Sequence, residues 1–439
     1  MGSYLPSTRD EQRQMLEAIG LKELRDLYTG DVPKSMLLDQ SVNIPEGLSE
    51  MAVRARMEKI AARNTVFQTV LRGAGSYDHY IPAIVSTVTS KEEFVTTYTP
   101  YQAEISQGVL QSIFEYQTMM AELTGMDVSN ASVYDGASAA AEAVMMTQTR
   151  TRSRIYVAST AHPEVIETIR TYCWGRDVAF EVIPQKDGLL DLTALAALPA
   201  DTACVYLQQP NFFGLFEDAG QVASLAHQAG AKAVMGFYPI SLGICKTPGE
   251  LGFDIAVGEG QSLGIPMSWG GPYLGIMTAK KDMMRMLPGR IAGETKDSQG
   301  RRAFVLTLQA REQHIRREKA SSNVCTNQAL CAMTAAVYLA AMGPEGLREV
   351  AQLCYEGAHY FAEELGRLKG FERVHQGEFF NEFLTRCPMD VHQFESEMVK
   401  RGILCGLTVD DGLLWCVTEK MDKQAIDEVI QVIKEVCGL

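Results

Sequence analysis

The residues best placed to do chemistry lie in a glycine-rich stretch at residues 234–277. Its pattern predicts a strand, a long turn, a second strand, a glycine-rich loop and a third strand. In α/β proteins, loops at the carboxyl ends of parallel strands hold the ligand, so this stretch is a candidate binding region. It has no lysine between Lys246 and Lys280 and no obvious nucleophile. Its polar candidates are Glu250, Asp254, Glu259, Gln261 and Ser262.

Two further segments have the composition of ligand-binding turns. The sequence YDGASAAAEAVMM at residues 134–146 is a small-residue turn that enters an alanine-rich helix. Such a helix start exposes N–H groups that bind anions, although tight packing more often explains the small residues. The sequence QQPNFFGLFED at residues 208–218 follows a predicted strand. This segment is either a functional loop or a turn whose residues were selected for its backbone geometry.

The seven histidines form no metal-binding spacing such as HxxxH and no Ser, His and Asp order typical of a nucleophilic triad. We therefore predict no metal site. His162 directly follows the predicted strand RIYVAS, and its position indicates a ligand-facing role. The basic segment at residues 280–328 is either a solvated helix face with paired charges or a contact for an anion or a partner.

The elements that would position these residues alternate between strand and helix over residues 154–277. Six short apolar runs predict buried strands, and two amphipathic segments predict crossover helices between them. This alternation is typical of a mostly parallel, helix-flanked sheet. We predict an α/β fold with a helical N-terminal arm at residues 1–90, a large domain at 91–340 and a small α+β domain at 341–439.

Capping residues predict where several helices begin and end. Residues 8–11 fit a capping box, and Ser49 precedes a charged helix. Thr99 and Gln102 fit a second capping box, which predicts a long amphipathic helix that ends at Gly125.

The composition excludes several classes of partner. The chain has 439 residues and a formal net charge of −14, which disfavours duplex nucleic acid and anionic membranes as main partners. Ten scattered cysteines without a CxxC pair indicate free thiols in a reducing compartment. The N-terminus is polar, and no apolar run approaches membrane-spanning length. We expect a cytoplasmic protein with neither nucleic-acid nor membrane partners.

Long motifs along nearly the whole chain resemble the P-protein family of the glycine cleavage system, in the alpha form found where the enzyme is split over two chains. They are YTPYQAEISQGVLQ, LTGMDVSNAS, QQPNFFGLFED, DIAVGEGQSLGIPMSWGGPYLG, GRIAGETKDSQGRRAFVLTLQAREQHIRREKASSNVCTNQAL and YLAAMGPEGL. The resemblance implies the type I fold of enzymes that depend on pyridoxal phosphate (PLP). That fold agrees with the predicted large α/β domain and small C-terminal domain.

The resemblance also implies that this chain has lost the residues that hold the cofactor. In the catalytic half of the family, a lysine after a histidine forms a Schiff base with PLP, and an aspartate holds the pyridine nitrogen. Here Gly260 and Gln261 stand at the His-Lys positions, and Tyr238 stands at the Asp position. Glutamine cannot form an imine, and tyrosine is a poor counter-ion for a pyridinium.

PLP is therefore expected on a lysine of a homologous beta subunit. Together the two chains would decarboxylate glycine and pass the aminomethyl group to the lipoyl arm of H-protein. This chain would supply the facing wall of the site, unless its polar segments are only intersubunit packing. The residues expected to face glycine are Tyr98, Thr99, Tyr101 and Gln102, and those expected to face the partner's PLP are Ser322, Asn323 and Thr326.

Two alternatives remain open at the level of sequence. The chain could be a non-catalytic scaffold or regulatory pseudoenzyme that binds a partner without shaping its site. It could also be a self-sufficient PLP enzyme that uses Lys246, Lys280 or Lys281.

Overall fold

The computed structural model describes residues 7–38, 42–97, 99–410 and 412–439. The chain separates into two compact units, residues 1–66 and residues 67–439. Each unit is described by itself below.

The N-terminal unit is helical, as predicted. Helix α1 (Arg9–Ala18) begins at a capping box formed by Thr8 and Glu11. Helix α3 (Glu50–Ala61) begins after Ser49, whose hydroxyl accepts a hydrogen bond from the N–H of Ala52. These caps satisfy N–H groups that a helix cannot pair internally. Helix α2 (Asp26–Thr29) and the 3-10 helix η1 (Lys34–Met36) lie between them in the sequence.

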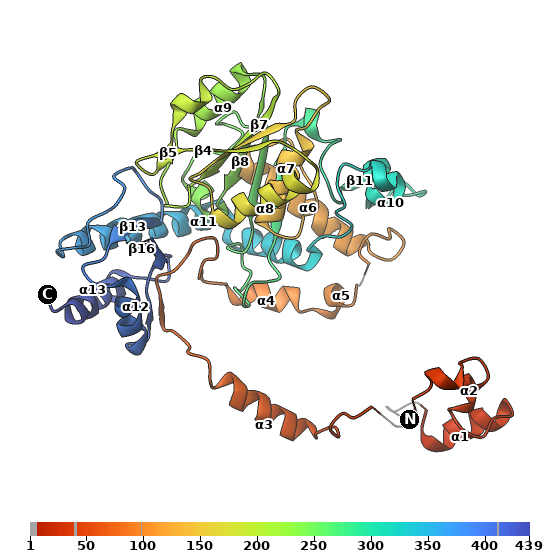
Figure 1. Cartoon of the computed structure of the whole chain (residues 1–439). Helices are drawn as coiled ribbons and strands as arrows, with labels where there is room; N and C mark the ends of the chain where they lie inside the picture. Colours follow the sequence, from red (N-terminus) through yellow and green to blue (C-terminus); the bar gives the residue numbers. More distant parts are fainter. Residues whose placement is uncertain (1–6, 39–41, 98, 411) are drawn as a thin grey trace. The chain divides into compact units, whose positions relative to one another are not determined.

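A seven-stranded sheet forms the centre of the second unit (Figure 1). Its strand order is β2-β10-β9-β8-β7-β3-β4, and the five strands from β9 to β4 run parallel. Strand β10 is antiparallel to both of its neighbours. The predicted mostly parallel sheet is therefore confirmed. The strands are β2 (Val128–Ser129), β3 (Arg154–Ala158), β4 (Phe180–Ile183), β7 (Thr202–Gln209), β8 (Lys232–Phe237), β9 (Ile255–Glu259) and β10 (Gly275–Ala279).

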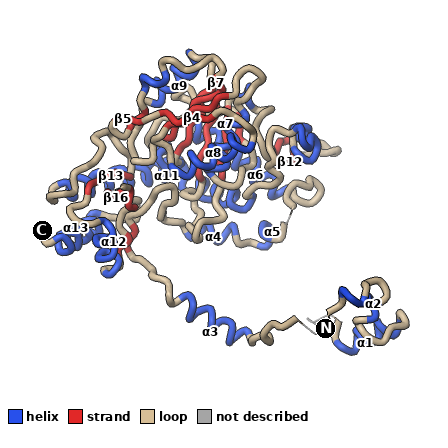
Figure 2. The backbone as a smooth tube through the Cα atoms, in the orientation of Figure 1, coloured by secondary structure: helices blue, strands red, loops and turns tan. Residues whose placement is uncertain are grey.

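Helices cover both faces of this sheet (Figure 2). Successive side chains of a strand point to opposite faces, so neighbouring residues of β7 enter different cores. Val205 and Leu207 pack with α6, α9 and α11, whereas Cys204 and Tyr206 pack with α7 and α8. The helices are α6 (Gln107–Thr124), α7 (Gly136–Met146), α8 (Pro163–Gly175), α9 (Ala219–Gln228) and α11 (Ala329–Gly366).

Helix α6 begins later than the sequence predicts. The capping box at residues 99–102 does not form, because residues 100–105 make turns instead. The helix begins at Gln107, whose side chain both donates to and accepts from the backbone of Phe304 at 2.8 Å. A tertiary contact therefore sets the start of this helix. The predicted end at Gly125 is confirmed, with a left-handed φ of 64°.

Helix α11 is longer and more apolar than expected. By length and composition alone it could cross a membrane, contrary to the prediction that no run approaches that length. Its backbone is kinked at Gly343, directly before Pro344. Ala332, Ala335 and Tyr338 are fully buried in the main hydrophobic core, so this part of α11 serves as a core helix.

The C-terminal part of the second unit contains both helices and strands. Strand β1 (Thr69–Val70) pairs in parallel with β14 (Ile403–Leu404), so the end of the predicted arm belongs to the second unit. The boundary expected near residue 340 falls inside α11, close to its kink. The other elements of this part are β13 (Glu382–Arg386), β15 (Leu407–Val409), β16 (Gly412–Cys416), α12 (Val391–Lys400) and α13 (Lys423–Cys437).

The basic segment at residues 280–328 contains a β-hairpin rather than a long helix. Strands β11 (Ala292–Lys296) and β12 (Arg302–Leu306) pair in it, and Arg302 forms an ion pair with Glu294 at 2.9 Å. Paired surface charges were one of the two predicted roles of this segment. The remaining short elements are α4 (Ala83–Thr89), α5 (Glu92–Val95), β5 (Gln185–Lys186), β6 (Leu189–Leu190) and α10 (Gln313–Arg316).

Candidate functional site

A cavity of about 530 Å³ lies at the carboxyl ends of β3, β7, β8 and β9. Five segments distant in sequence complete its wall: residues 74–77, the start of α7, residues 270–273, Gln328 before α11 and the start of β13. Its size and its position at the sheet edge are typical of ligand sites in α/β proteins. The glycine-rich stretch singled out from the sequence therefore does border a cavity.

The start of α7 faces this cavity but is occupied by two carboxylates. Asp135 caps the helix by accepting from the N–H of Ser138 at 2.7 Å, and Glu259 accepts from the N–H of Gly136 at 2.9 Å. A Cβ added at Gly136 would lie 2.9 Å from the Cβ of Glu259. The small residues here serve tight packing. The two acids take the N–H groups that a phosphate would need, so the phosphate cradle is not formed.

The loop after β9 wraps around the carboxylate of Glu259. Backbone N–H groups of Gly136, Gln261 and Leu274 donate to it at 2.9, 3.0 and 2.9 Å. Burial raises its pKa to about 7, and the charge of Asp135 adds to the increase while the three N–H groups oppose it. A carboxylate therefore stands two residues before Gln261, the position at which the resemblance predicts the Schiff-base lysine.

Gln261, at the predicted Schiff-base position, has a structural contact in this chain. Its amide nitrogen donates to the carbonyls of Tyr77 and Ile265 at 3.0 and 2.9 Å, and its amide oxygen accepts from the N–H of Tyr77 at 2.8 Å. The side chain is 3 % exposed and is not part of the cavity lining. It ties the loop after β9 to the segment that carries Tyr77.

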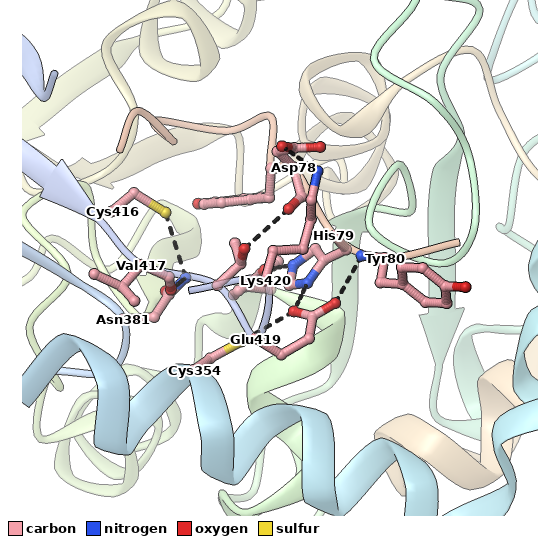
Figure 3. A network of polar contacts seen from close by, with 12 residues as sticks. Asp78, His79, Tyr80, Cys354, Asn381, Cys416, Val417, Glu419 and Lys420 are labelled. Atoms are coloured by element: carbon pink, nitrogen blue, oxygen red, sulfur yellow. Dashed lines mark hydrogen bonds and ion pairs between the residues drawn. The ribbon is translucent and has the colours of Figure 1, made fainter. Parts of the chain in front are cut away.

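Tyr238, at the predicted pyridine-binding position, lines the cavity but is engaged with a histidine. Its ring lies 4.2 Å from that of Tyr77, and its hydroxyl is hydrogen-bonded to Nε2 of His79. Nδ1 of His79 contacts Glu419 at 2.6 Å, and the N–H of Tyr80 donates to the same carboxylate (Figure 3). Burial alone would raise the pKa of Glu419, but His79 and Tyr80 outweigh it and lower the pKa.

This network also contains the candidate metal ligands of the described part of the chain. His79, Cys354 and Glu419 each offer an atom, and these atoms lie within 4.8 Å of one another. Both ring nitrogens of His79 and both oxygens of Glu419 already have protein partners. A metal would have to displace those contacts. We therefore describe His79, Cys354 and Glu419 as part of a hydrogen-bond network (Figure 3).

Glu382, at the start of β13, is a second buried carboxylate on the cavity wall. It accepts from the N–H of Ala74 at 2.7 Å and from the hydroxyl of Tyr77 at 2.8 Å. Burial raises its pKa to about 7, and those two donors oppose the increase. Gly214 makes its position possible, because a Cβ at Gly214 would lie 1.9 Å from the carbonyl oxygen of Glu382.

His162 lines the cavity, as its position after β3 predicted. Nδ1 accepts from the N–H of Glu164 at 3.1 Å, so Nε2 carries the hydrogen that is donated to the carbonyl of Ala74 at 2.9 Å. The predicted turn at residues 208–218 borders the cavity through Gln208 and Pro210. Its Asn211 is buried and bonds only protein groups, which fits a turn chosen for its geometry.

The residues of this cavity do not fit PLP. Among the described residues that line it there is neither a lysine for a Schiff base nor an arginine for the phosphate. Lys280 bonds the carbonyl of Gly252, and its backbone N–H bonds that of Asp254, at the opposite end of β9 from the cavity. Lys246 and Lys281 do not line the cavity either. The geometry therefore does not support a self-sufficient PLP enzyme.

Some of the residues predicted to face a partner lie close together. The hydroxyl of Tyr101 bonds Asn327, next to Thr326, and the guanidinium of Arg290 lies 5.0 Å from the Tyr101 ring. Ser322 was expected to face the partner, but in this chain it is buried and its hydroxyl accepts from the N–H of Val324. Tyr98 lies outside the described residues. We call the four exposed members the polar surface: Thr99, Gln102, Asn323 and Thr326.

Sequence reasoning missed the segment at residues 73–80. Its Tyr77 lines the cavity, and its His79 bonds Tyr238 and Glu419. It also missed Glu382 and Glu419, which meet that segment across about 300 residues of chain. The run GAGSYDHY, with two glycines beside three aromatic residues, was the available signal. Glycines of this kind allow close backbone approach, and a Cβ at Gly73 would lie 2.5 Å from Glu382 Oε1.

Comparison with protein families gives a match over nearly the whole chain. The family model described as "Glycine cleavage system P-protein" matches residues 2–433. A probable glycine dehydrogenase (decarboxylating) subunit 1 from Desulforamulus reducens is 48 % identical over 435 residues, covering 97 % of each chain. A protein with the same description from Desulfitobacterium hafniense is 45 % identical over 445 residues, covering 99 % of this chain and all of the relative.

Solved structures agree in fold. A crystal structure of glycine decarboxylase (P-protein) of the glycine cleavage system, in inhibitor-bound form, has a TM-score of 0.93 and 41 % identity, covering 99 % of this chain and 100 % of that chain. Sphingosine-1-phosphate lyase of Burkholderia pseudomallei has a TM-score of 0.66 at 14 % identity, covering 94 % of both chains. Aspartate aminotransferase of Thermus thermophilus has a TM-score of 0.60 at 13 % identity, covering 84 % of this chain and 99 % of that chain. The fold is the type I fold of PLP-dependent enzymes, as predicted.

Proposed function

Because this chain belongs to the glycine cleavage system P-protein family, we propose that it is subunit 1, the alpha subunit, of a two-chain glycine decarboxylase. A chain of this kind works with a partner subunit 2. The pair decarboxylates glycine and transfers the aminomethyl group to the lipoyl arm of H-protein. The observation that carries the assignment is full-length similarity to relatives named subunit 1.

In this proposal PLP is bound covalently by the beta subunit and not by this chain. Support comes from the cavity described above, where acids take the N–H groups that a phosphate would need. It also comes from Gln261 on the adjoining loop, whose amide cannot form an imine. PLP supplies the electron sink for decarboxylation where it is bound. No step of the reaction passes through the cavity of this chain.

The contribution of this chain to the shared site is to orient substrate and exclude water. The polar surface and Tyr101 would form the wall that faces the partner's cofactor. Their exposure supports this role, because Thr326, Asn323, Thr99 and Gln102 are free to contact another chain. Arg290 holds Tyr101 in place from one side. Fixed polar groups lower the cost of orienting a small substrate.

One set of measurements tests the assignment. The purified chain, the beta subunit and their mixture are each incubated with PLP, and visible absorbance and glycine-dependent CO₂ exchange are recorded. We expect the Schiff-base band in the beta subunit and in the mixture, and CO₂ exchange only in the mixture. A band from this chain alone would overturn the cofactor assignment. Full exchange by the beta subunit alone would favour the scaffold alternative.

A cytoplasmic location is part of the same proposal. All ten cysteines are free thiols in the described chain, and five of them are buried in the hydrophobic clusters of the second unit. Persistent free thiols suit a reducing compartment. Fluorescent tagging or fractionation of cells that express the chain checks this point.

A further inference from the structure

The cavity that does not suit PLP has a consistent chemistry of its own. Its lining brings together four carboxylates, Asp135, Glu164, Glu259 and Glu382, with the rings of several tyrosines. No lysine or arginine belongs to the lining residues described. The ion pairs of the described chain include neither Glu259 nor Glu382, so their charges have no cationic partner. An anionic ligand would be repelled here, whereas a cation would be attracted.

Two side chains on the cavity wall are almost fully buried, and each has one polar atom without a protein partner. Tyr206 is 2 % exposed, and its hydroxyl oxygen would lie 2.2 Å from a Cβ built on Gly236. The missing side chain at Gly236 leaves room for this hydroxyl, which has no hydrogen bond to any described residue. Asn381 is also 2 % exposed, and its amide nitrogen bonds Val417 while its carbonyl oxygen accepts from no described residue. Neither atom is among the fully enclosed unpaired atoms of the described chain, and both residues line the cavity, so each atom is open to it and can bond a ligand or water.

We propose that this cavity binds a small organic cation, a protonated primary amine that carries no acidic group. An ammonium group has three donors and needs acceptors such as Tyr206 Oη, Asn381 Oδ1 and the Glu382 carboxylate. The rings of Tyr77 and Tyr238 pack against each other at 4.2 Å, and the parts of them that line the cavity suit a cation or its alkyl chain. Glycine is not the expected ligand, because its carboxylate would meet Asp135 and Glu259 without a compensating cation.

The raised pKa values of the two glutamates agree with this proposal. Burial raises the pKa of both Glu259 and Glu382 to about 7, because their negative charge is desolvated without a nearby cation. A bound ammonium group would supply the missing positive charge and favour ionisation of both carboxyls. The inference does not depend on which subunit holds PLP during turnover, so it stands apart from the proposed function.

The test uses n-butylammonium chloride as the probe and 1-butanol as its neutral analogue of nearly equal size. Binding to the full-length chain, alone and assembled with its beta subunit, is measured by saturation-transfer NMR titration at pH 8. We expect saturable binding of butylammonium, at least tenfold tighter than binding of butanol. Butyrate, which has the same chain length and a negative charge, should show no binding. Equal binding of butanol and butylammonium would overturn the proposal.

Matched variants assign the binding to this cavity. Tyr206→Phe removes the unpaired hydroxyl and should weaken butylammonium binding about threefold to tenfold. Tyr116→Phe is its control, because Tyr116 is fully buried, its hydroxyl also lacks a partner, and it does not line the cavity. Glu382→Gln should weaken binding at least tenfold, while its single amide oxygen can still accept from the N–H of Ala74.

If Glu382→Gln does not fold, Tyr206→Phe alone decides the matter. An unchanged affinity in folded Tyr206→Phe, or an equal loss in Tyr116→Phe, would reject this cavity as the amine site. Glycine turnover of the assembled enzyme is recorded in parallel, so failure of the amine site is distinguishable from failure of the proposed function.

Discussion

The cavity and the polar surface of this chain contrast in how their polar groups are used. At the cavity wall, Glu259 and Asp135 bond backbone groups of the same chain, as does Gln261 on the adjoining loop. On the polar surface, Thr99 and Thr326 are exposed. The polar groups around the cavity are thus engaged within the chain. The groups that we propose contact a second chain lie on the outside.

The largest expected effect would break the cavity wall at Gly214. Gly214→Ala places a Cβ 1.9 Å from the backbone of Glu382 and strains a φ of 83°. We expect a loss of roughly 3 kcal/mol or more in the free energy of unfolding. Gly300→Ala is the matched control, because Gly300 has a φ of 78° and nothing within 4 Å, and it should cost about 1 kcal/mol. Equal losses in urea unfolding would show that the close approach to Glu382 is unimportant.

A second effect concerns the pH dependence of stability. Glu259 and Glu382 have a pKa of about 7 when folded, above the ordinary 4.5. An acid with a raised folded pKa takes up a proton on folding, so its favourable contribution is complete below about pH 4.5 and is lost as the pH rises through 7. Each group should then cost roughly 3 kcal/mol of stability at pH 8 relative to pH 4.5.

Replacing one of these acids should therefore flatten the stability profile between pH 5 and pH 8. The titratable groups that interact with Glu382 are Tyr77 and Cys416, and the acid that interacts with Glu259 is Asp135. We expect Glu382→Gln to lose less stability over this range than the unmodified chain in thermal unfolding. Glu428→Gln, at an exposed position of α13, should follow the unmodified chain. A parallel profile for Glu382→Gln would show that this carboxyl does not titrate as proposed.

A smaller effect, about tenfold, is expected from the polar surface. Thr326→Val and Tyr101→Phe should each lower kcat/KM for glycine-dependent CO₂ exchange in the assembled enzyme, because polar groups that orient the substrate are lost. Thr87→Val, at an exposed position of α4, should leave it unchanged. Size-exclusion chromatography verifies that assembly is intact. Unchanged turnover in both variants would leave intersubunit packing as the role of these residues.

The smallest effect, no change at all, is expected for PLP binding by Gln261→Lys. An amine placed at this position should give no Schiff-base absorbance with PLP in the isolated chain. The position is turned toward the backbone of Tyr77 and Ile265, and the start of α7 remains occupied by acids. A new absorbance band would mean that one residue had been enough to abolish the site, and the contrast between the two regions would fail.

The central sheet was predictable from sequence because strands and helices there have clear periods. Strand β7 has the predicted limits, Thr202–Gln209, and α8 follows its predicted segment closely. Local capping also predicted Thr8 and Ser49 correctly. It failed at residues 99–102, where the contact of Gln107 with Phe304 overrode the local signal. Propensity and capping are local terms that a tertiary contact can outweigh.

The sequence by itself determined the fold class, the family and the absence of a lysine between Lys246 and Lys280, since each can be recognised from residues close together in the chain. Only the tertiary structure decided which side chains line the cavity and what they bond. Tyr77 meets Glu382 across 305 residues, and His79 meets Glu419 across 340. Such contacts leave no periodic pattern, because they depend on where separate segments arrive in space. The acidic, cation-free cavity is therefore a property of the folded chain.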